Sequence, residues 1–349
     1  FETWFLIFLL AVQIIYAIMT KLHTRNQVSV RGFKSIKIIF KVFLTECYAN
    51  ARGLMNNYQT QTQNIKFWQW KSWQICYNSQ GDQGEAIILV HGFGASWGHW
   101  RKNIPVLAQN YRVFAIDLIG FGASAKPAPE LINYTFETWS NLIADFTREV
   151  VKTPAFLVGN SIGCVVIMQT VIDYPDLFLG VCLINCSLRL LHDKKRAKLP
   201  FYKNYGSMLL QNLLSIDWVG EWFFKQIAKR DVVKKILLQA YHNKDAVTSE
   251  LIDILMAPVE DEGAKDVFIA FTRYSQGPLP EELLPKLPCE AIIIWGKNDP
   301  WEDFNLGQEF AKFPTVKKFI PLENIGHCPQ DEAPELVNQI VKDWISAKI

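Results

Sequence analysis

The sequence predicts an α/β fold whose mostly parallel, doubly wound sheet is covered by helices. Short apolar runs alternate with helical patterns along most of the 349 residues, and this alternation is typical of parallel strands joined by helices. Several apolar runs end in loops that carry glycine or polar residues, as parallel strands do at the edge where ligands bind. The expected parallel strands are residues 86–90, 112–116, 155–158, 179–185, 291–295 and 317–322.

The neighbouring elements follow from local periodicity. Residues 67–77 alternate enough between apolar and polar side chains to indicate antiparallel strands at the edge of the sheet. Residues 136–151 and 162–172 carry apolar side chains at helical spacing, and each segment lies between two expected strands. We therefore expect two helices that connect parallel strands.

Residues 187–284 break the alternation of strands and helices. They contain helical patterns, for example at 206–214, 218–228 and 231–241, and no clear parallel strand. We expect a helical cap that is inserted after the sixth strand and lies over the active site, where caps determine substrate choice. Large apolar side chains at helical spacing are usually core, but their number here also favours an apolar substrate tunnel or a membrane contact. These side chains are Leu209, Leu210, Leu213, Leu214, Trp218, Trp222, Phe223 and Phe224.

Ser161 is the candidate nucleophile. It is the centre of a Gly-x-Ser-x-Gly pattern, Gly159 to Gly163, with the apolar run 155–158 before it and the helical pattern 162–172 after it. Such a sharp strand-to-helix turn holds a serine in a strained conformation with its hydroxyl exposed. The amides that open the helix can then stabilise an oxyanion. The strand and helix on either side carry this inference, because the short pattern alone also arises by chance.

Asp299 and His327 are the candidate partners of Ser161. Each follows an expected strand, and the chain order is serine, aspartate, histidine. An imidazole takes the serine proton, and a carboxylate fixes the imidazole tautomer and stabilises the imidazolium. Glu302 and Asp303 are close to Asp299 in the same turn. The competing interpretation is three unrelated residues, namely a serine at a helix start, an aspartate in a turn and a histidine on the surface.

Residues 91–96 are the expected oxyanion loop. They follow an expected strand and contain two glycines, which allow the backbone to approach a substrate oxygen closely. The expected oxyanion donors are the backbone N–H groups of Phe93 and Ile162. His91 is a candidate base, but a histidine here is expected to brace the loop by hydrogen bonds. Asp117, with glycines just after it, is likewise expected to brace its loop.

Five segments together resemble the α/β-hydrolase superfamily. They are residues 91–94, 117–124, 159–163, 299–301 and 326–329, and the resemblance extends over residues 65–186 and 285–349. Within the superfamily, the chain is most similar to the pheophytinase and chlorophyll dephytylase-like branch of plants and cyanobacteria. This closer resemblance rests on Asn160 before the nucleophile, and on Asp-Pro-Trp and Gly-His-Cys-Pro in the last two segments.

The resemblance implies an ester hydrolase that needs no cofactor and acts on the phytyl ester of a chlorophyll-type pigment. Cys164 is a departure, since relatives usually carry a second glycine there, and it weakens the assignment to the pheophytinase subgroup proper. Asn before the nucleophile also occurs in C–C bond hydrolases of aromatic ring-cleavage products, which use the same triad. Epoxide hydrolases and haloalkane dehalogenases look similar around His91 and Asp117, but they use an aspartate nucleophile where this chain has Ser161.

Residues 3–20 predict a membrane anchor. They contain no charged residue and are mostly apolar, and as a helix they would be about 27 Å long, close to the thickness of a bilayer core. No basic residue precedes the run and no small-residue cleavage site follows it, which favours an anchor over a signal peptide. The positive flank predicts that the following domain lies on the cytoplasmic or stromal side, for example of a thylakoid membrane. The flank contains Lys21, Arg25, Arg31, Lys34, Lys37 and Lys41.

The segment after the anchor has two interpretations. Residues 31–50 combine basic and apolar positions at helical spacing, so they can lie in the interface of an anionic membrane or pack on the catalytic domain. Residues 56–64 are polar and aperiodic, which is typical of a linker.

Composition excludes some classes of function. The net charge of +2 gives no global signal for nucleic-acid binding. Half of the residues are hydrophobic, with 12 Trp and 23 Phe, which is rich for a soluble enzyme. The seven cysteines are scattered, mostly in apolar segments, which predicts reduced core thiols. No Cys-x-x-Cys pattern or His/Cys cluster suggests a metal, and no metal or other cofactor is expected.

These inferences give a predicted organisation of the whole chain. Residues 1–22 are a transmembrane anchor, 23–64 a basic amphipathic segment and linker, 65–186 and 285–349 the hydrolase core, and 187–284 the helical cap. We expect a membrane-anchored serine hydrolase that cleaves a hydrophobic ester through an acyl-enzyme. Its expected partners are that ester, the bilayer and a membrane protein complex. The alternatives are a C–C bond hydrolase and a catalytically silent scaffold of a membrane complex.

Overall fold

The structure, a computed structural model, describes residues 64–190, 192–197 and 217–348. Residues 64–349 form one compact unit of the chain. The predictions of an anchor, a basic segment and a linker, and of the cap helix at 206–214, lie outside the described residues. None of the described helices is long and apolar enough to cross a membrane.

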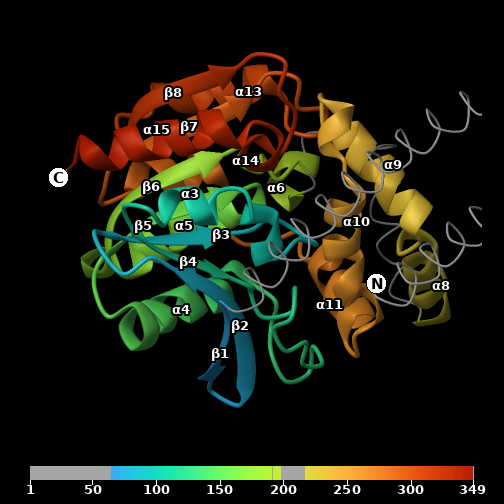
Figure 1. The fold of residues 1–349 in the computed structure, drawn as a ribbon. Coiled ribbons are helices and arrows are strands. Elements are labelled where there is room, and N and C mark those ends of the chain that lie inside the picture. The colour runs from blue at the N-terminus through green and yellow to red at the C-terminus, as the bar shows by residue number, and fades with distance from the viewer. Residues whose placement is uncertain (1–63, 191, 198–216, 349) are drawn as a thin grey trace, which may run out of the picture. The chain divides into compact units, whose positions relative to one another are not determined.

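An eight-stranded sheet forms the centre of this unit (Figure 1). Its strands are β1 (Ile65–Trp70), β2 (Trp73–Gln80), β3 (Ala86–Val90), β4 (Arg112–Ile116), β5 (Ala155–Asn160), β6 (Phe178–Ile184), β7 (Ala291–Gly296) and β8 (Val316–Leu322). They lie in the order β1-β2-β4-β3-β5-β6-β7-β8. β2 pairs antiparallel with both β1 and β4, and all other neighbours are parallel. The predicted fold, a mostly parallel sheet with antiparallel strands at one edge, is confirmed.

Helices cover the sheet and fill its connections. Those of the core are α3 (Ile104–Leu107), α4 (Phe136–Phe146), α5 (Ile162–Asp173), α13 (Phe304–Gln308), α14 (Pro329–Glu332) and α15 (Pro334–Ser346). Short 3-10 turns lie at Trp97–Trp100, Pro175–Leu177, Lys244–Ala246, Ala257–Glu260, Leu284–Lys286 and Glu309–Lys312.

Both faces of the sheet are buried at its central strands, which explains why these strands are continuously apolar. In β3, Ile88 and Val90 belong to the core layer formed with α4 and α5. Ile87 and Leu89 belong to the opposite layer, formed with α3 and α15. Alternate side chains of one strand therefore fill two cores, and neither face shows the polar alternation of a solvent-exposed sheet.

Several elements differ in extent from the expectation, and two of the differences have a visible cause. The strand expected over residues 155–158 is two residues longer, because its last two residues pair with β6 despite their low strand propensity. The helix expected over residues 136–151 is α4 followed by a π-helical turn at Thr147–Val151. There the hydroxyl of Thr147 donates a hydrogen bond to the carbonyl of Ile143, and such bonds accompany local departures from the α-helical ladder.

The insertion between β6 and β7 folds as a helical cap. Figure 1 shows α8 to α11 together at one end of the unit, with α15 at the other. The described residues of the insertion contain no strand, as their pattern predicts. A small apolar core within the cap includes Leu237, Tyr241 and Leu251 and also reaches Cys328 of the hydrolase core. The described cap helices are α6 (Asp193–Arg196), α8 (Asp217–Ile227), α9 (Arg230–Ala240), α10 (Ser249–Met256), α11 (Ala264–Arg273) and α12 (Pro280–Leu283).

Candidate active site

Ser161 lies in a sharp turn between β5 and α5. Its φ of 56° and ψ of −120° lie in a region that residues with side chains rarely adopt. A Cβ atom on Gly159 would lie 2.7 Å from the carbonyl carbon of Gly163, and one on Gly163 would lie 2.5 Å from the carbonyl oxygen of Val90. Both glycines of the pattern are thus required by close backbone packing, which holds the serine in its strained conformation at the start of the helix.

Asp299 and His327 lie side by side at the same edge of the sheet. Nδ1 of His327 is 2.7 Å from Oδ2 of Asp299, and both side chains are buried. In this arrangement the Nδ1–H group donates to the carboxylate, and Nε2 is left to take up a proton.

Asp299 is held in its ionised form by its hydrogen-bond donors. Besides His327, the side-chain amide of Asn185 donates to Oδ2 at 2.6 Å. The backbone N–H groups of Trp301 and Glu302 donate to Oδ1 at 2.8 and 3.1 Å. Burial by itself would raise the pKa of Asp299, but the bond and charge of His327 and the bond from Asn185 outweigh it, so the pKa lies below its usual value.

Asn185 is a site residue that sequence reasoning missed. It directly follows β6, and its backbone adopts a left-handed φ of 43°. Its side-chain oxygen accepts a hydrogen bond from the backbone N–H of Gly296 at 2.9 Å, while its amide donates to Asp299. The available signal was its position, because it is a polar residue at the carboxyl end of a parallel strand.

Asn160 links the nucleophile turn to the histidine loop. Its side-chain amide donates to the carbonyl oxygens of Ile184 and His327, at 3.1 and 3.2 Å. The residue before Ser161 therefore holds the backbone of His327 directly. In the sequence Asn160 is only a marker of the family resemblance, and the structure gives it a positioning contact.

The other acids of the Asp299 turn have separate partners. Glu302 accepts a hydrogen bond from the backbone N–H of Leu188 at 2.8 Å, and burial raises the pKa of its carboxyl group to about 7. Asp303 accepts from the backbone N–H of Leu306 at 3.0 Å and caps α13. Of the three acids in this turn, the structure pairs Asp299 with the histidine.

The expected oxyanion loop lies against the nucleophile turn. A Cβ atom on Gly92 would be 3.2 Å from the Cβ of Ser161. Within the described part of the chain, the backbone N–H groups of Phe93 and Ile162 donate no hydrogen bond. Phe93 follows Gly92 and Ile162 follows Ser161 in the chain, so the two groups remain candidates to bind a negative oxygen that develops beside Ser161.

Aromatic side chains of the cap cover this loop. The ring of Phe93 stacks on that of Phe271, with centroids 4.8 Å apart, and lies 5.5 Å from that of Phe268. Both partners belong to α11 of the cap. On the core side, Phe121 lies 5.7 Å from Phe93 in an edge-to-face arrangement. The surroundings of the candidate oxyanion hole are thus strongly apolar.

His91 and Asp117 brace the loops around the site. Nδ1 of His91 lies 2.7 Å from the carbonyl oxygen of Gly92, and its Nε2 accepts a hydrogen bond from the backbone N–H of Leu118 at 3.1 Å. Complete burial lowers the pKa of His91 to about 4, which keeps the ring neutral. Asp117 accepts hydrogen bonds from backbone N–H groups in two loops, and burial raises its pKa to about 7. The structure gives both residues the bracing role that their sequence context predicts.

The cap also contacts the histidine loop through its backbone. The N–H group of His327 donates to the carbonyl of Ala240 at 2.8 Å. Glu332 accepts hydrogen bonds from the N–H groups of Gly326 and Asn243, at 2.9 and 2.6 Å. One carboxylate thus joins the loop before His327 to the loop that follows α9. No local sequence pattern predicts the contacts with Ala240 and Asn243, because they link segments far apart in the chain.

A buried polar network lies next to this junction. The hydroxyl of Tyr241 donates to the carboxylate of Asp331 at 2.8 Å and lies 2.8 Å from Nε2 of His99. Arg101 and Lys102 form ion pairs with Asp331 at 2.8 and 3.0 Å. Burial opposes ionisation of Asp331, but these cations hold its pKa below its usual value. The network connects the cap with α14 and with the loop before α3.

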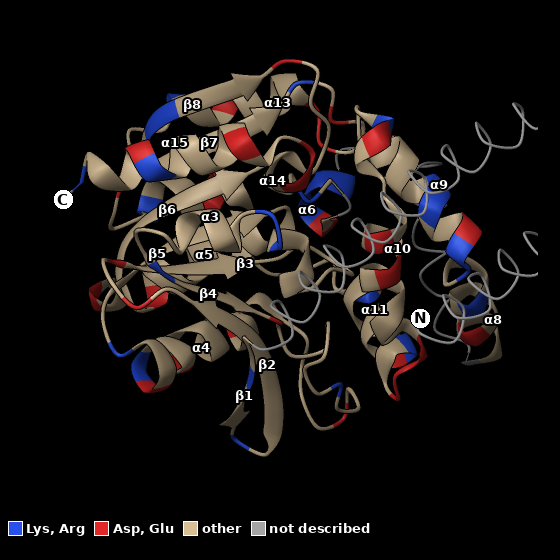
Figure 2. Cartoon of the chain, viewed as in Figure 1, with Lys and Arg blue, Asp and Glu red and all other residues tan. Residues whose placement is uncertain are grey.

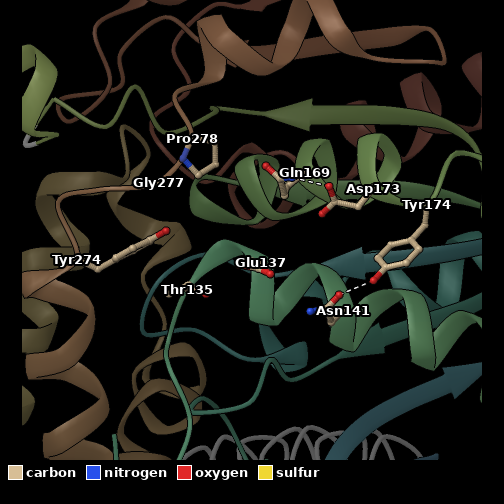
Figure 3. A pocket seen from close by; sticks show the side chains of 9 residues that line it. All are labelled: Thr135, Glu137, Asn141, Gln169, Asp173, Tyr174, Tyr274, Gly277 and Pro278. Atoms are coloured by element: carbon tan, nitrogen blue, oxygen red, sulfur yellow. Dashed lines mark hydrogen bonds between the residues drawn. The ribbon is translucent and has the colours of Figure 1, made fainter.

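A cavity of about 400 Å³ lies away from this site (Figure 3). Its lining includes Asp173 and Tyr174, at the far end of α5 and about 18 Å from Ser161 by helix rise. Its polar side chains bond one another, as Gln169 does with Asp173 and Tyr174 with Asn141. The cavity is therefore separate from the candidate active site. Across the described residues, no group of three or more His, Cys, Asp or Glu side chains could hold a metal ion.

Comparison with known proteins agrees with this fold. The chain matches the family model of the alpha/beta hydrolase family over residues 87–340. It is 28% identical over 269 residues to the uncharacterized hydrolase YugF of Bacillus subtilis, covering 77% of this chain and 92% of that protein. It is 23% identical over 298 residues to the chloroplastic pheophytinase of Arabidopsis thaliana, covering 74% of this chain and 61% of that protein. A solved structure of the meta-cleavage product hydrolase from Pseudomonas fluorescens superposes with a TM-score of 0.63 at 19% identity, covering 82% of this chain and 100% of that one.

Proposed function

Because the chain belongs to the alpha/beta hydrolase family, we propose that it is a serine hydrolase that cleaves a hydrophobic ester through an acyl-enzyme. Ser161 is the nucleophile, His327 is the general base and acid, and Asp299 orients His327. The backbone N–H groups of Phe93 and Ile162 bind the oxyanion. The observation that carries this proposal is the 2.7 Å contact between Nδ1 of His327 and Oδ2 of Asp299, at the sheet edge where Ser161 occupies its strained turn.

The chemistry follows from these contacts. As the hydroxyl of Ser161 attacks the ester carbonyl, its proton moves to Nε2 of His327, and Asp299 stabilises the imidazolium. The negative oxygen forms beside Ser161, where the two backbone N–H groups stabilise it without reorganisation. The imidazolium then gives its proton to the leaving alcohol, which departs and leaves the acyl-enzyme. Water, activated by the same histidine, hydrolyses the acyl-enzyme and restores the serine.

The proposed substrate is a membrane-dissolved ester with a long apolar chain. The aromatic side chains around Phe93 suit such a chain, since burying each additional CH₂ group contributes about 0.8 kcal/mol. A relative named chloroplastic pheophytinase supports the phytyl ester of chlorophyll or pheophytin as the favoured candidate. Residues 3–20 are proposed to anchor the protein in the membrane that holds the substrate, with the hydrolase on the cytoplasmic or stromal side.

A second candidate is hydrolysis of a C–C bond in a ring-cleavage product. The specific observation in its favour is Asn160, which directly precedes the nucleophile and binds the backbone of His327. The likeness of fold to a meta-cleavage product hydrolase is consistent with it. The two reactions differ in substrate, because the C–C hydrolase acts on a soluble ring-cleavage product and the proposed esterase on an apolar ester.

Labelling with a fluorophosphonate tests the nucleophile. The wild-type protein should be labelled, and Ser161→Ala should abolish labelling and lower kcat on any ester by about three to six orders of magnitude. Ser249→Ala, at an exposed position of α10, is the matched control and should label as the wild type does. Labelling that survives in Ser161→Ala would assign the nucleophile elsewhere.

An ester series tests the substrate class. kcat/KM is measured for esters from acetyl to phytyl-like chains in detergent, together with phytol release from chlorophyll and pheophytin. We expect kcat/KM to rise with chain length. A preference for short soluble esters, or for a ring-cleavage product, would reject the proposed substrate and, in the second case, favour the C–C hydrolase.

A further inference from the structure

Two tryptophans of the cap project from α8 into solvent. Trp218 is 73% exposed and Trp222 is 60% exposed. Tryptophan is usually buried over most of its surface, so two such side chains one helical turn apart are unusual. Nothing in the proposed catalytic machinery uses them.

These tryptophans share one face of α8 with a lysine. Successive residues of an α-helix are rotated by about 100°, so Trp218, Trp222 and Lys225 lie within about 60° of one another around the helix. Lys225 is exposed and pairs with Glu221 of the same helix. The outer face of α8 is therefore aromatic toward the start of the helix and charged toward its end.

The two helices also carry a small positive charge. Residues 217–240, from the start of α8 to the end of α9, contain five cations and three acids, a net charge of +2. One of the cations, Arg230, pairs with Asp253 of α10. Figure 2 shows several of the cations along α9. Seven of the charged residues are exposed, namely the cations Lys225, Lys229, Arg230, Lys234 and Lys235 and the acids Glu221 and Asp231.

The opposite face of α8 leads toward the candidate active site. Phe223 and Phe224 contact Phe268 of α11, with ring centroids 6.4 and 5.6 Å away. Phe268 in turn lies 5.5 Å from Phe93 of the oxyanion loop. A continuous row of aromatic rings thus connects the exposed helix with the loop beside Ser161.

We propose that α8 and α9 dock on the surface of an anionic lipid bilayer. Trp218 and Trp222 enter the interface at the level of the headgroups, and the cations contact lipid phosphates and carboxylates. This inference rests on the proposed function, because the docked helix delivers a membrane-dissolved ester to the aromatic row that leads to Ser161.

The chemistry of the surface favours a bilayer over a protein partner. The indole ring has an apolar body and a polar N–H group, a combination that places tryptophan at membrane interfaces. Cations beside it are attracted by the negative surface potential of anionic membranes. Lysine is depleted from protein–protein interfaces, and a second copy packed around a two-fold axis would bring two surfaces of like charge together.

The environment of a fluorophore at position 222 tests the proposal on the full chain. A Trp222→Cys variant is labelled with a polarity-sensitive dye in a Cys47→Ser, Cys289→Ser background, where the cysteines left in the described residues are buried. It is reconstituted with phosphatidylcholine vesicles that contain phosphatidylserine and lipids with brominated chains. We expect a blue shift and strong quenching by the brominated lipids.

The matched control is a label at Leu336→Cys. Leu336 is also an exposed apolar residue, at 53%, but it lies on α15, at the other end of the unit from α8 (Figure 1). Its label should remain in water and be quenched several times less. Equal, weak quenching at both positions would overturn the proposal. Protection of the label at 222 from aqueous iodide without vesicles would also overturn it, because another segment or a second copy would then cover α8.

The charges are tested in the same assay. The label at position 222 is either in contact with the bilayer or exposed to water, and the assay gives the ratio of the two populations. On vesicles with phosphatidylserine, the double change Lys234→Glu and Lys235→Glu should lower this ratio about tenfold. On pure phosphatidylcholine the ratio should not change. An equal change on both kinds of vesicle would contradict recognition of anionic lipid.

Because the readout is independent of hydrolysis, the two proposals fail separately. Ester cleavage with a water-exposed label at 222 overturns the docking surface and leaves the proposed function standing. A bilayer-contacting label in a protein that cleaves no ester supports the surface and contradicts the proposed function.

Discussion

At the scale of single residues, the structure separates three acids that the sequence places within one turn. Asp299 contacts Nδ1 of His327, Glu302 accepts from the backbone of Leu188, and Asp303 caps α13. Chemically similar side chains thus have different roles, because they point from the turn toward different partners. The consequences can be measured by replacing each acid with its amide.

We predict that Asp299→Asn lowers kcat by about four orders of magnitude, since an amide no longer fixes the tautomer of His327. Glu302→Gln and Asp303→Asn should retain kcat within about tenfold, because neither carboxylate bonds the imidazole in the structure. The measurement is kcat for the three variants on one ester. If Asp303→Asn were the most damaging change, the assignment of the orienting acid would be wrong.

Asn185 should act as a positioning residue for Asp299. Asn185→Ala removes a donor to the carboxylate, so we expect kcat/KM to fall about 10- to 100-fold and the acid limb of its pH profile to move to higher pH. Alanine is also strained at a positive φ, and Asn324→Ala, at an exposed position with a φ of 58°, is the control for that strain. Equal activity losses in the two variants would show that Asn185 has a structural role and does not position Asp299.

Glu302 gives a pH dependence of stability. Burial raises the pKa of Glu302 to about 7 in the folded protein, whereas the pKa of an unfolded glutamate is about 4.3. Between these values the folded state binds more protons, so this group makes stability fall as pH rises from about 4 to about 7. We expect the Tm of Glu302→Gln to decline less over that range than the Tm of the wild type. Asp303→Asn should follow the wild type, and the same curve for all three proteins would contradict the buried, protonated Glu302.

At the scale of secondary-structure elements, the end of α9 and the loop before α14 form one junction. The carbonyl of Ala240 accepts a hydrogen bond from His327, and Glu332 bonds backbone groups on both sides of the junction. The cap is thus attached to the loop that carries the proposed general base. A change in the junction should affect both stability and catalysis.

We predict that Glu332→Ala removes the acceptor of three backbone N–H groups, those of Gly326, His242 and Asn243, and destabilises the fold by about 1–3 kcal/mol. It should also lower kcat more than KM changes, because the loop that positions His327 loses its support. Thermal unfolding and steady-state kinetics measure the two effects. Glu335→Ala, at an exposed position in the first turn of α15, is the control and should change neither. Unchanged kcat in Glu332→Ala would separate the junction from catalysis.

At the scale of the whole molecule, a hydrolase unit follows a segment whose composition favours a membrane. Residues 64–349 form a compact unit with its own sheet and cores. Residues 3–20 are apolar and are followed by a basic flank. The expected consequence is a protein that is held at the membrane by one part of the chain and catalyses with another.

We predict that the full chain sediments with membranes and resists extraction at high salt, because an apolar span is insensitive to screening. A chain that begins at residue 64 should be released, or be retained only by a salt-sensitive contact of the cap. Protease added to the cytoplasmic or stromal face should reach the hydrolase. Full-length protein in the soluble fraction, or cleavage only from the opposite face, would contradict the anchor.

The sequence by itself determined the fold class and the candidate nucleophile. Alternating apolar runs predicted the parallel strands, and the glycines around Ser161 predicted a turn that the structure shows with a φ of 56°. These inferences succeeded because strand periodicity and turn chemistry act over a few residues. Asp299 and His327 were predicted as partners of Ser161 on equally local grounds, because each follows an expected strand and the two come in the expected chain order.

Only the tertiary structure decided which side chains support those partners. Asn185 donates to Asp299 across 114 positions of the chain, and Asn160 donates to the carbonyl of His327 across 167. The contact between Ala240 of the cap and His327 also joins segments that are far apart in the chain. Such contacts depend on the register of neighbouring parallel strands and on where the inserted helices pack, and no local pattern encodes either. Local chemistry therefore identified the candidate residues, and long-range packing determined how they are held.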